Sequence, residues 1–343
     1  MERAMSELAL NFCKEKNLVV HLILYGRDPE IFYSVPQNLI IHRPRKAFNN
    51  RFRLIYTLGR MLFLRRSVKL IGPDAVLSFG EYWNSFVLLA LLVTKYPIFI
   101  SDRCSPTKTF GTFHQVLRKW LYPKSQGVIA QTEIAKQMYI SGLRYNKIGV
   151  IGNPIRQSKT FGNTNRENIV LTVGRLIESK HHDKLIELFS EIPVNNWKLV
   201  IVGDDAIKQK NMDRLRELIE RLNMGGKIIL TGNIQDVEFY YQKSKIFVFT
   251  SSSEGFPNVI GEALSAGLPV ISFDCVAGPS ELIQNGENGY LIPLFDYKSF
   301  KIALHNLMID SKLREKMSLK APPSIARFSS ETISKTYLEF IFS

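Results

Sequence analysis

Residues 247–281 read FVFTSSSEGFPNVIGEALSAGLPVISFDCVAGPSE, and the rest of the chain is organised around them. An apolar, β-rich run from Ile246 to Thr250 ends in a serine cluster, and a second apolar run follows from Pro269 to Phe273. Between them a short helix is predicted, because Pro257 suits its first position and Gly267 the position just past its end. This order of strand, loop, helix and strand puts the helix N-terminus at the carboxyl end of a parallel sheet, where its N–H groups bind anions.

Two glutamates bracket the N-terminus of the predicted helix. Glu254 lies in the loop and Glu262 within the helix, with seven residues between them. An isolated pair of this kind is usually a solvated helix residue and a carboxylate favoured by the helix dipole. Here the pair lies in the context EGFPNVIGEA, and the whole context resembles the E-x7-E signature of the retaining GT-B glycosyltransferases of the GT4 group. Within that group the chain resembles the N-acetylgalactosaminyltransferases that act on lipid-linked oligosaccharides.

The resemblance assigns roles to the residues of this turn. It implies that Glu262 binds the ribose of a nucleotide sugar and that Glu254 contacts the donor sugar. The backbone N–H groups near Asn258 and Val259 are expected to face the diphosphate. The other positions implied for nucleotide-sugar binding are Gly174, Gly255, Pro257 and Ile234, which ends a loop that lies against the nucleobase in relatives.

A second motif supplies positive charge. A strand predicted over residues 169–173 leads into residues 174–176 (GRL), and Lys180 follows. This resembles the family's G-R-L…K element, in which the arginine and the lysine grip the donor diphosphate. A departing nucleoside diphosphate gains negative charge as the glycosidic bond breaks, and two fixed cations stabilise it. We therefore expect Glu254, Arg175 and Lys180 to be catalytic, with no metal ion and no cofactor beyond the donor substrate.

Length and composition are those of a globular protein with room for two domains, at 343 residues and 45% hydrophobic content. The longest apolar run, Phe86 to Val93, is too short to span a bilayer. The three cysteines show neither a metal-binding nor a disulfide spacing, which favours a reducing cytosol.

The positive charge is concentrated in the first half. Residues 1–150 hold 22 Lys and Arg against 9 Asp and Glu, a net charge of +13, whereas the remainder carries +1. Such a surface suits an anionic membrane, a lipid diphosphate or a nucleic acid, and a surface that only keeps the protein soluble is an equal alternative. Four cations of a helix predicted over residues 51–69 share about a third of its circumference: Arg51, Arg65, Arg66 and Lys69. We expect this face to touch lipid headgroups.

The first half alternates strands and helices, as a parallel sheet requires. Its strand over residues 98–101 ends in Asp102-Arg103, where many relatives carry a histidine close to the reacting sugar. Two interpretations stay open: these side chains orient an acceptor hydroxyl or contact phosphate, or they form a surface ion pair. His114, in a predicted helix, is expected to be structural.

The predicted fold is α/β, with two Rossmann-like domains whose parallel sheets face a cleft, which is the GT-B architecture. An acceptor-binding domain is expected over residues 1–152, a linker over 153–168, a nucleotide-sugar domain over 169–321, and a helix crossing back to the first domain over 322–343. The first strand of the N-terminal domain is expected to be missing, because the opening helix MERAMSELALNF follows a strand and a Gly-Gly turn in the family. We therefore expect an in-frame extension upstream.

The resemblance implies transfer of a hexose or N-acetylhexosamine, with retention, from a UDP-sugar to a lipid-linked saccharide in capsule, O-antigen or exopolysaccharide biosynthesis. A front-face substitution is expected, since no second carboxylate pair has glycosidase-like surroundings. The expected location is the cytoplasm, peripheral on the anionic inner face of the bacterial cytoplasmic membrane. Three alternatives stay open: a GT-B UDP-sugar epimerase, a GDP-sugar transferase, and a basic nucleic-acid-binding protein. The last requires a recognised module or interleaved aromatics on a basic face, and the sequence shows neither, so nucleic acid is not an expected partner.

Overall fold

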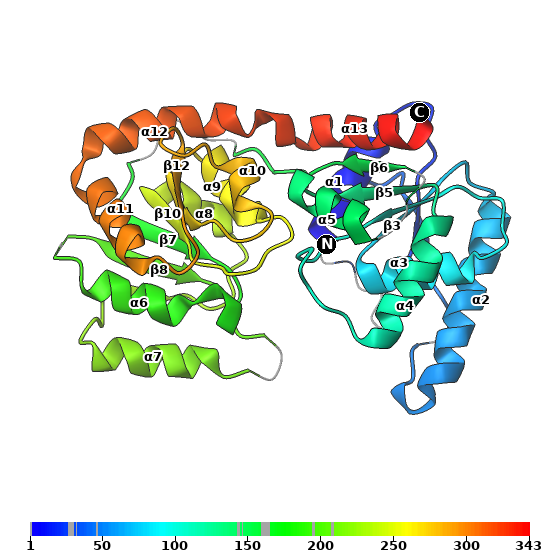
Figure 1. Ribbon diagram of the computed structural model, residues 1–343, viewed down its shortest axis with the longest axis horizontal. Helices are drawn as coiled ribbons and strands as arrows, with labels where there is room; N and C mark the ends of the chain where they lie inside the picture. Colours follow the sequence, from blue (N-terminus) through cyan, green and yellow to red (C-terminus); the bar gives the residue numbers. More distant parts are fainter. Residues whose placement is uncertain are drawn as a thin grey trace. The chain divides into compact units, whose positions relative to one another are not determined.

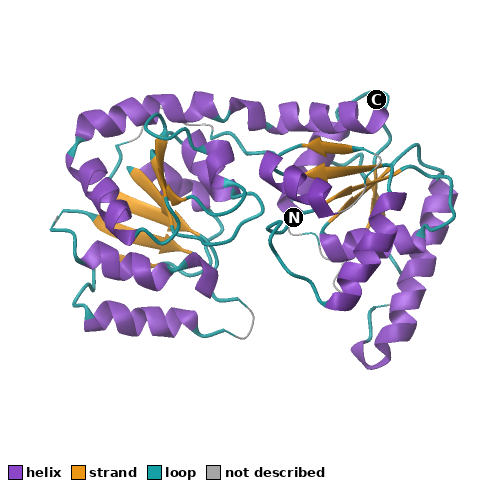
Figure 2. Cartoon of the chain, in the orientation of Figure 1, coloured by secondary structure: helices purple, strands orange, loops and turns teal. Residues whose placement is uncertain are grey.

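The computed structural model describes residues 2–26, 31, 33–45, 47–142, 145, 147–158, 165–193, 196–206 and 209–343. The chain divides into two compact units, each with helices around a parallel sheet (Figures 1 and 2). Unit 1 comprises Met1–Pro154 and Ser330–Ser343, and unit 2 comprises Ile155–Ser329. No helix in the described part of the chain is both long and apolar enough to cross a membrane.

Unit 1 contains a four-stranded parallel sheet in the order β3-β4-β5-β6 and a separate parallel pair, β1-β2. The strands are β1 (His21–Ile23), β2 (Ile40–His42), β3 (Val76–Phe79), β4 (Ile98–Ser101), β5 (Gly127–Ala130) and β6 (Ile148–Val150). All residues of β4 and β5 are buried. Their continuous apolar sequence is typical of parallel strands that are covered on both faces.

The helices of unit 1 are α1 (Glu2–Phe12), α2 (Arg53–Ile71), α3 (Glu81–Ala90), α4 (Thr112–Leu121), α5 (Glu133–Gly142) and α13 (Ser330–Phe342), with the 3₁₀ turns η1 (Asn50–Phe52) and η2 (Tyr122–Lys124). Helices α2 and α4 both pack on α3. Helix α13 packs on α1, and its Phe340 ring meets Phe99 of β4 edge to face at 5.9 Å. Lys147 next to β6 donates to the Phe340 carbonyl at 2.9 Å, which fixes the same helix end.

Two of the four cations predicted to share one face of this helix differ from that prediction: Arg51 lies in η1, before α2 begins, and Arg65 is engaged by α3. The Arg65 guanidinium donates to the carbonyls of Ala90 and Leu92, at 3.1 and 3.0 Å. These carbonyls lie at the C-terminal end of α3, where a cation satisfies unpaired groups and suits the helix dipole. Arg65 therefore ties α2 to α3, while Arg66 and Lys69 are exposed.

Unit 2 contains a six-stranded parallel sheet in the order β12-β11-β10-β7-β8-β9. The strands are β7 (Ile169–Val173), β8 (Lys198–Val202), β9 (Ile228–Leu230), β10 (Ile246–Phe249), β11 (Val270–Phe273) and β12 (Gly289–Ile292). The chain fills one side of the sheet from β7 to β9 and then returns to pair β10 with the other edge of β7. The point between β7 and β10 is therefore the topological switch point, beyond whose carboxyl ends ligands bind in this class of sheet.

The helices of unit 2 are α6 (His182–Ser190), α7 (Asn211–Arg221), α8 (Val237–Lys243), α9 (Asn258–Ser265), α10 (Pro279–Leu282), α11 (Tyr297–Ile309) and α12 (Ser311–Ser324), with η3 (Glu178–Lys180) and η4 (Ala326–Phe328). One core cluster joins α6, α7 and α11 to alternate residues of the sheet, among them Val170, Ile201 and Val248. The preceding residue of β10, Phe247, points to the opposite face and packs on Tyr241 of α8. This alternation is the period of two that a strand imposes.

The boundary between the units lies at Pro154, inside the stretch predicted as a linker. Ile155 is buried in unit 2, where its N–H donates to the Phe328 carbonyl at 2.7 Å. Residues 159–164 of that stretch lie outside the described residues. The expected crossing helix over residues 322–343 is two elements: α12 and η4 stay with unit 2, and α13 begins at Ser330 in unit 1.

Candidate active site

The sequence-predicted donor residues follow the two strands at the switch point. Gly174 and Arg175 come directly after β7, and the loop that contains Glu254 comes after β10. The Gly174 N–H donates to the Val202 carbonyl at 2.9 Å. A Cβ on Gly203, whose φ is +152°, would lie 1.9 Å from the Gly174 carbonyl oxygen, so this approach of the β7 and β8 ends requires glycine. The same Gly203 donates its N–H to the Gly232 carbonyl at 3.2 Å, which brings in the loop that ends at Ile234.

Lys180 and Glu254 meet although 74 positions separate them in the chain. The Lys180 Nζ lies 2.5 Å from the Glu254 Oε1, and their side chains are only 15% and 16% exposed. The Ser251 hydroxyl donates to the same carboxylate oxygen at 2.6 Å. Lys180 also lies 4.4 Å from the centroid of the Phe249 ring, and its carbonyl accepts from the Thr250 hydroxyl at 2.6 Å. The end of β10 therefore fixes both the charge and the backbone of Lys180.

Helix α9 starts and ends close to its predicted limits. Pro257 is its N-cap rather than its first residue, and Gly267 follows its C-cap with φ +77°. Pro257 is fixed by a loop after β11, since a Cβ on Gly278 would lie 2.4 Å from the proline ring. The Asn258 N–H donates to the Phe256 carbonyl at 3.0 Å, so it is engaged within its own turn. The diphosphate contacts expected near Asn258 and Val259, and those of Gly255, stay predictions.

Glu262 is buried, with 8% of the residue exposed. Its Oε2 accepts a hydrogen bond from the Tyr241 hydroxyl at 3.1 Å. Arg175, in contrast, is exposed at the end of β7. The donor-side residues named from the sequence thus all lie in unit 2, on the loops after β7, β9 and β10 and in α9.

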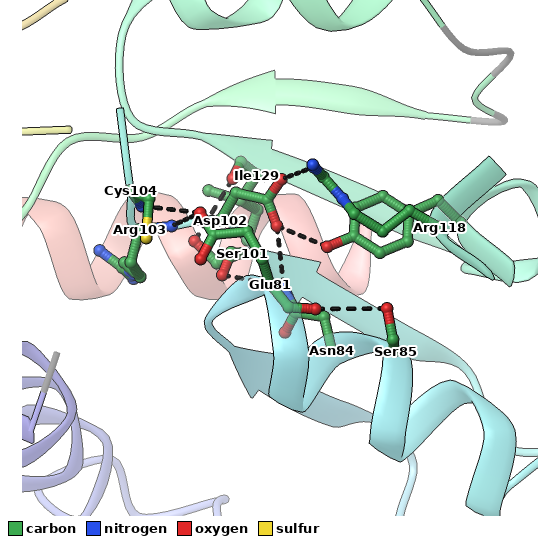
Figure 3. A network of polar contacts seen from close by, with 10 residues as sticks. Glu81, Asn84, Ser85, Ser101, Asp102, Arg103, Cys104, Arg118 and Ile129 are labelled. Carbon is green, nitrogen blue, oxygen red and sulfur yellow. Dashed lines mark hydrogen bonds and ion pairs between the residues drawn. The ribbon is translucent and has the colours of Figure 1, made fainter. Parts of the chain in front are cut away.

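A buried polar network lies at the ends of β3 and β4 in unit 1 (Figure 3). Asp102 is 1% exposed and accepts from three donors: the Arg118 guanidinium at 2.5 Å, the Tyr122 hydroxyl at 2.8 Å and the Asn84 amide at 3.0 Å. Burial raises the pKa of Asp102 to about 6, and the Arg118 guanidinium opposes that rise. Asp102 therefore pairs with Arg118, not with Arg103, and the expectation of a surface ion pair is wrong.

Arg103 points into unit 1 as well. Its guanidinium donates to the Asn153 Oδ1 and to the Tyr337 hydroxyl, the latter at 2.7 Å, and lies 4.5 Å from the centroid of the Phe79 ring. The backbone N–H groups of Arg103 and Cys104 donate to the Glu81 Oε1 at 2.9 and 2.7 Å. In this structure Asp102 and Arg103 therefore shape their loop from inside the unit, and the acceptor or phosphate contact considered for them stays a prediction.

His114 and His182 are both buried, in different surroundings. His114 is buried against Tyr82 and Phe110, with ring centroids 4.2 and 5.2 Å away, which agrees with a structural role. His182 is buried at the start of α6, and desolvation, followed by the charge of Lys180, lowers its pKa to about 4. In the parts of the chain that the structure describes, no three His, Cys, Asp or Glu side chains gather as metal ligands would.

The sequence patterns did not identify the residues that form hydrogen bonds with the predicted site residues. Glu81 carried a signal, because it follows Gly80 as the first residue of a helix that begins at a strand end. Tyr241, Arg118 and Ser251 carried none, since nothing in their local sequence indicates the carboxylate that each one contacts. Each contact depends on the tertiary packing.

Comparison with known families decides what unit 2 is. The model of the family described as glycosyl transferases group 1 matches residues 155–322. Residues 155–322 are a glycosyl transferases group 1 domain. The resemblance to glycosyltransferases read from EGFPNVIGEA and from GRL is therefore confirmed, while the GT4 assignment and the retaining mechanism stay predictions.

The relatives found cover most of the chain. The amylovoran biosynthesis glycosyltransferase AmsD of Erwinia amylovora is 26% identical over 322 residues, which are 91% of this chain and 88% of AmsD. The N-acetylgalactosamine-N,N'-diacetylbacillosaminyl-diphospho-undecaprenol 4-alpha-N-acetylgalactosaminyltransferase of Campylobacter jejuni is 26% identical over 340 residues, 94% of this chain and 91% of that protein. The crystal structure of HepE from Anabaena in complex with UDP and glucose has a TM-score of 0.82 at 18% identity and covers 100% of this chain and 95% of HepE. The fold is thus that of the GT-B glycosyltransferases, with two Rossmann-like domains, as predicted.

Proposed function

We propose that the chain is a retaining glycosyltransferase that moves a hexose or an N-acetylhexosamine from a UDP-sugar to a lipid-linked saccharide in bacterial cell-surface polysaccharide biosynthesis. The observation that carries the proposal is the 2.5 Å contact between Lys180 and Glu254 at the switch point of the unit 2 sheet. It joins the two motifs, GRL…K and E-x7-E, that the sequence shows 74 positions apart.

The charges of this pair match the charges of the reaction. Cleavage of a glycosidic bond to a diphosphate leaves positive charge on the sugar, which becomes oxocarbenium-like, and negative charge on the leaving group. Glu254 and Lys180 offer a carboxylate and an ammonium in a site that is largely shielded from water, where such charges act strongly. Arg175, exposed at the end of β7, is the second cation for the diphosphate. We infer that these two cations perform the task of a metal ion.

The names of the relatives support the acceptor and the pathway. The Campylobacter jejuni relative is named for a diphospho-undecaprenol-linked acceptor, and AmsD is named for the synthesis of amylovoran. UDP is the proposed donor nucleotide, since HepE was crystallised with UDP and glucose. The named N-acetylgalactosamine transfer favours an N-acetylhexosamine among the donors to be tried first.

The surface of unit 1 supports docking on an anionic membrane. Helices α2 and α4 contain no acidic residue. Their outward apolar side chains, which we call the α2–α4 surface, are Leu54, Ile55, Leu58, Leu62, Leu70, Phe113, Val116 and Trp120. Leu54 is 81% exposed and Phe113 is 81% exposed, a degree that water disfavours. The exposed cations Arg66, Lys69 and Lys119 lie on the same two helices, so the surface combines apolar contact with charge attraction, as interfacial helices do.

The test is an assay of the full chain with UDP- and GDP-linked hexoses and N-acetylhexosamines, together with undecaprenyl-diphosphate-linked saccharides as acceptors. We expect release of UDP and a product whose new linkage has the anomeric configuration of the donor, seen by NMR. Activity is expected to persist in EDTA. Turnover of GDP-sugars alone, an inverted product, or interconversion of free UDP-sugars without transfer would each contradict the proposal.

A further inference from the structure

Glu262 has a partner that constrains the direction of its carboxylate. The Tyr241 hydroxyl lies 3.1 Å from the Glu262 Oε2 and 3.4 Å from the Val259 carbonyl oxygen. A tyrosine hydroxyl has one proton, and it forms the stronger bond with the nearer, charged acceptor. A carboxylate offers about four lone-pair positions, so a bond to tyrosine leaves capacity for the hydroxyl groups of a ribose.

Tyr241 is itself fixed. It is 2% exposed, and its ring packs against Phe247 of β10 with centroids 5.9 Å apart. A buried ring cannot change rotamer without displacing its neighbours in a densely packed interior. The hydroxyl therefore presents its proton from one direction, and the Glu262 carboxylate turns to meet it.

Arg166 ties together the two helices that carry this pair. Its guanidinium donates to the carbonyls of Tyr241 and Ser244, at 3.0 and 2.6 Å, at the end of α8. It also donates to the Ala266 carbonyl, at 2.5 Å, at the end of α9. The last carbonyls of a helix have no partner within it, and a cation suits them. Arg166 thus sets the spacing between the helix of Tyr241 and the helix of Glu262.

Ser158 bridges the same two helices at another point. Its N–H donates to the Ser265 hydroxyl of α9 at 2.6 Å, and its own hydroxyl donates to the Glu238 carboxylate of α8. Ser158 and Arg166 both belong to the stretch that the sequence predicted as a linker. The described parts of that stretch therefore hold α8 and α9 together.

We propose that Tyr241, held in place through Arg166, is the positioning residue that aims the Glu262 carboxylate and so sets the preference of the site for ribonucleoside over 2′-deoxyribonucleoside diphosphates. This inference rests on the proposed function, in which Glu262 binds the ribose of a UDP-sugar. A carboxylate that is aimed at two adjacent hydroxyls loses a bond when the 2′-hydroxyl is absent. A carboxylate that is free to turn distinguishes the two sugars less well.

The experiment compares the affinities of UDP and of dUDP for the full chain by calorimetry. We expect the wild type to bind UDP more tightly than dUDP. Tyr241→Phe keeps the ring and removes only the hydroxyl, and we expect it to weaken UDP binding about tenfold, as loss of one hydrogen bond to a charged group does. The affinity for dUDP is expected to fall much less, so that the ratio of the two dissociation constants approaches one. If Tyr241 acted on stability alone, the affinities for UDP and for dUDP would fall equally, and this result would overturn the proposal.

Two variants calibrate the result. Tyr240→Phe removes a hydroxyl from the adjacent residue of the same helix and is expected to keep the wild-type ratio. Glu262→Ala is expected to remove the difference between the dissociation constants of UDP and dUDP. Retention of the wild-type ratio by Tyr241→Phe, when Glu262→Ala loses it, overturns the role of Tyr241 and leaves the proposed function intact. A wild type that does not bind UDP refutes the proposed donor instead.

Arg166→Lys provides a second route to the same readout. The substitution keeps the positive charge and removes the fork that reaches both helix ends. We expect the ratio of the UDP and dUDP dissociation constants to fall, and this variant decides the question if Tyr241→Phe does not fold. An unchanged ratio in the folded Arg166→Lys protein would show that the link between α8 and α9 has no effect on ribose selection.

Discussion

Replacement of Lys180 by alanine tests the centre of the proposed mechanism. In the structure the Lys180 ammonium contacts the Glu254 carboxylate at 2.5 Å, and both side chains are about five-sixths shielded, with exposures of 15% and 16%. Without Lys180, the hydroxyl of Ser251 still donates to that carboxylate. The variant therefore removes one cation and leaves a partly buried anion that retains one neutral donor.

Two magnitudes follow from this geometry. Leaving a buried group without its charged partner costs about 1–3 kcal/mol of folding stability. Removing one fixed donor from the charge that develops in a transition state costs about 2.7–4 kcal/mol, a hundredfold to a thousandfold loss of kcat. Because the leaving diphosphate gains charge only as the bond breaks, we expect kcat to fall more than donor affinity.

The assay measures kcat and KM for the donor, together with a thermal melt that shows the variant to be folded. Lys184→Ala is the matched control, since Lys184 pairs with Glu187 at 2.8 Å nearby in the chain but with exposures of 49% and 39%. An exposed pair contributes at most about 1 kcal/mol to folding stability. Lys184 is also not among the proposed site residues, so kcat is expected to stay at the wild-type level. Glu254→Gln and the double variant complete a cycle, and contacting residues of one site are expected to be strongly non-additive.

Three results would contradict the proposed role of Lys180. A Lys180→Ala enzyme with full kcat and a raised KM would show that the lysine contributes only ground-state binding. An equal loss in Lys184→Ala would assign the effect to the general charge of this segment. Rescue of an EDTA-treated wild type only by Mg²⁺ or Mn²⁺ would show that a metal ion, rather than Arg175 and Lys180, stabilises the leaving diphosphate.

The remaining predictions concern the ribose, the pH dependence of stability and the membrane. Glu262→Ala is expected to weaken UDP binding about tenfold to a hundredfold, from the loss of about 1.5–3 kcal/mol of charged hydrogen bonds, and calorimetry showing unchanged affinity in a folded variant would remove the assignment. Burial lowers the pKa of His182 from 6.5 to about 4, so between these values the unfolded chain binds a proton that the folded one does not, and stability falls as the pH falls. The loss is about 3 kcal/mol at pH 4, and urea melts of His182→Gln are expected to show a flatter slope than the wild type over that window; parallel slopes would contradict this. Binding to anionic liposomes is expected to fall with salt and to drop on replacement of Arg66 and Lys69 by glutamine or of Leu58 and Leu62 by serine. The same glutamine substitutions at the exposed Lys312 and Lys316 of unit 2 are the control, and equal binding of the wild type to neutral liposomes would defeat the membrane proposal.

Much of the fold was predictable because its signals are local. Apolar runs of strand length that alternate with helical patterns specify a parallel sheet, and the loops that leave parallel strands all start at one edge of it. The two donor motifs could thus be assigned to the carboxyl edge of a parallel sheet, and the structure brings Lys180 and Glu254 into contact there. Pro257 and Gly267 mark the ends of α9 to within two residues, since each restricts or permits particular backbone angles.

The wrong predictions concern charged side chains that can either extend into solvent or bind a partner that is distant in the sequence. Periodicity puts Arg65 on the same arc of α2 as Arg66 and Lys69, but Arg65 bonds with two carbonyls at the end of α3. Asp102 and Arg103 are adjacent and of opposite charge, yet adjacent strand-end residues point in different directions, so each finds its own partners. Net charge and residue spacing do not predict these contacts, because each contact depends on which carbonyls and rings the packing brings near.

The same limit explains why a stretch without periodicity was predicted as a linker. Residues 153–168 offer neither helical nor strand spacing, and sequence patterns detect only elements that repeat. Arg166 acts through a single fork that meets the open ends of two helices, a geometry that needs no repeat. Such contacts form where helices end, because the last carbonyls of a helix have no partner within it. In this chain the ends of α8 and α9 converge on one guanidinium, and Tyr241 and Glu262 of those helices are themselves hydrogen-bonded. A polar residue in an aperiodic stretch is therefore best judged by the helix ends within its reach, and in this protein that criterion leads from Arg166 to the carboxylate proposed to hold the donor ribose.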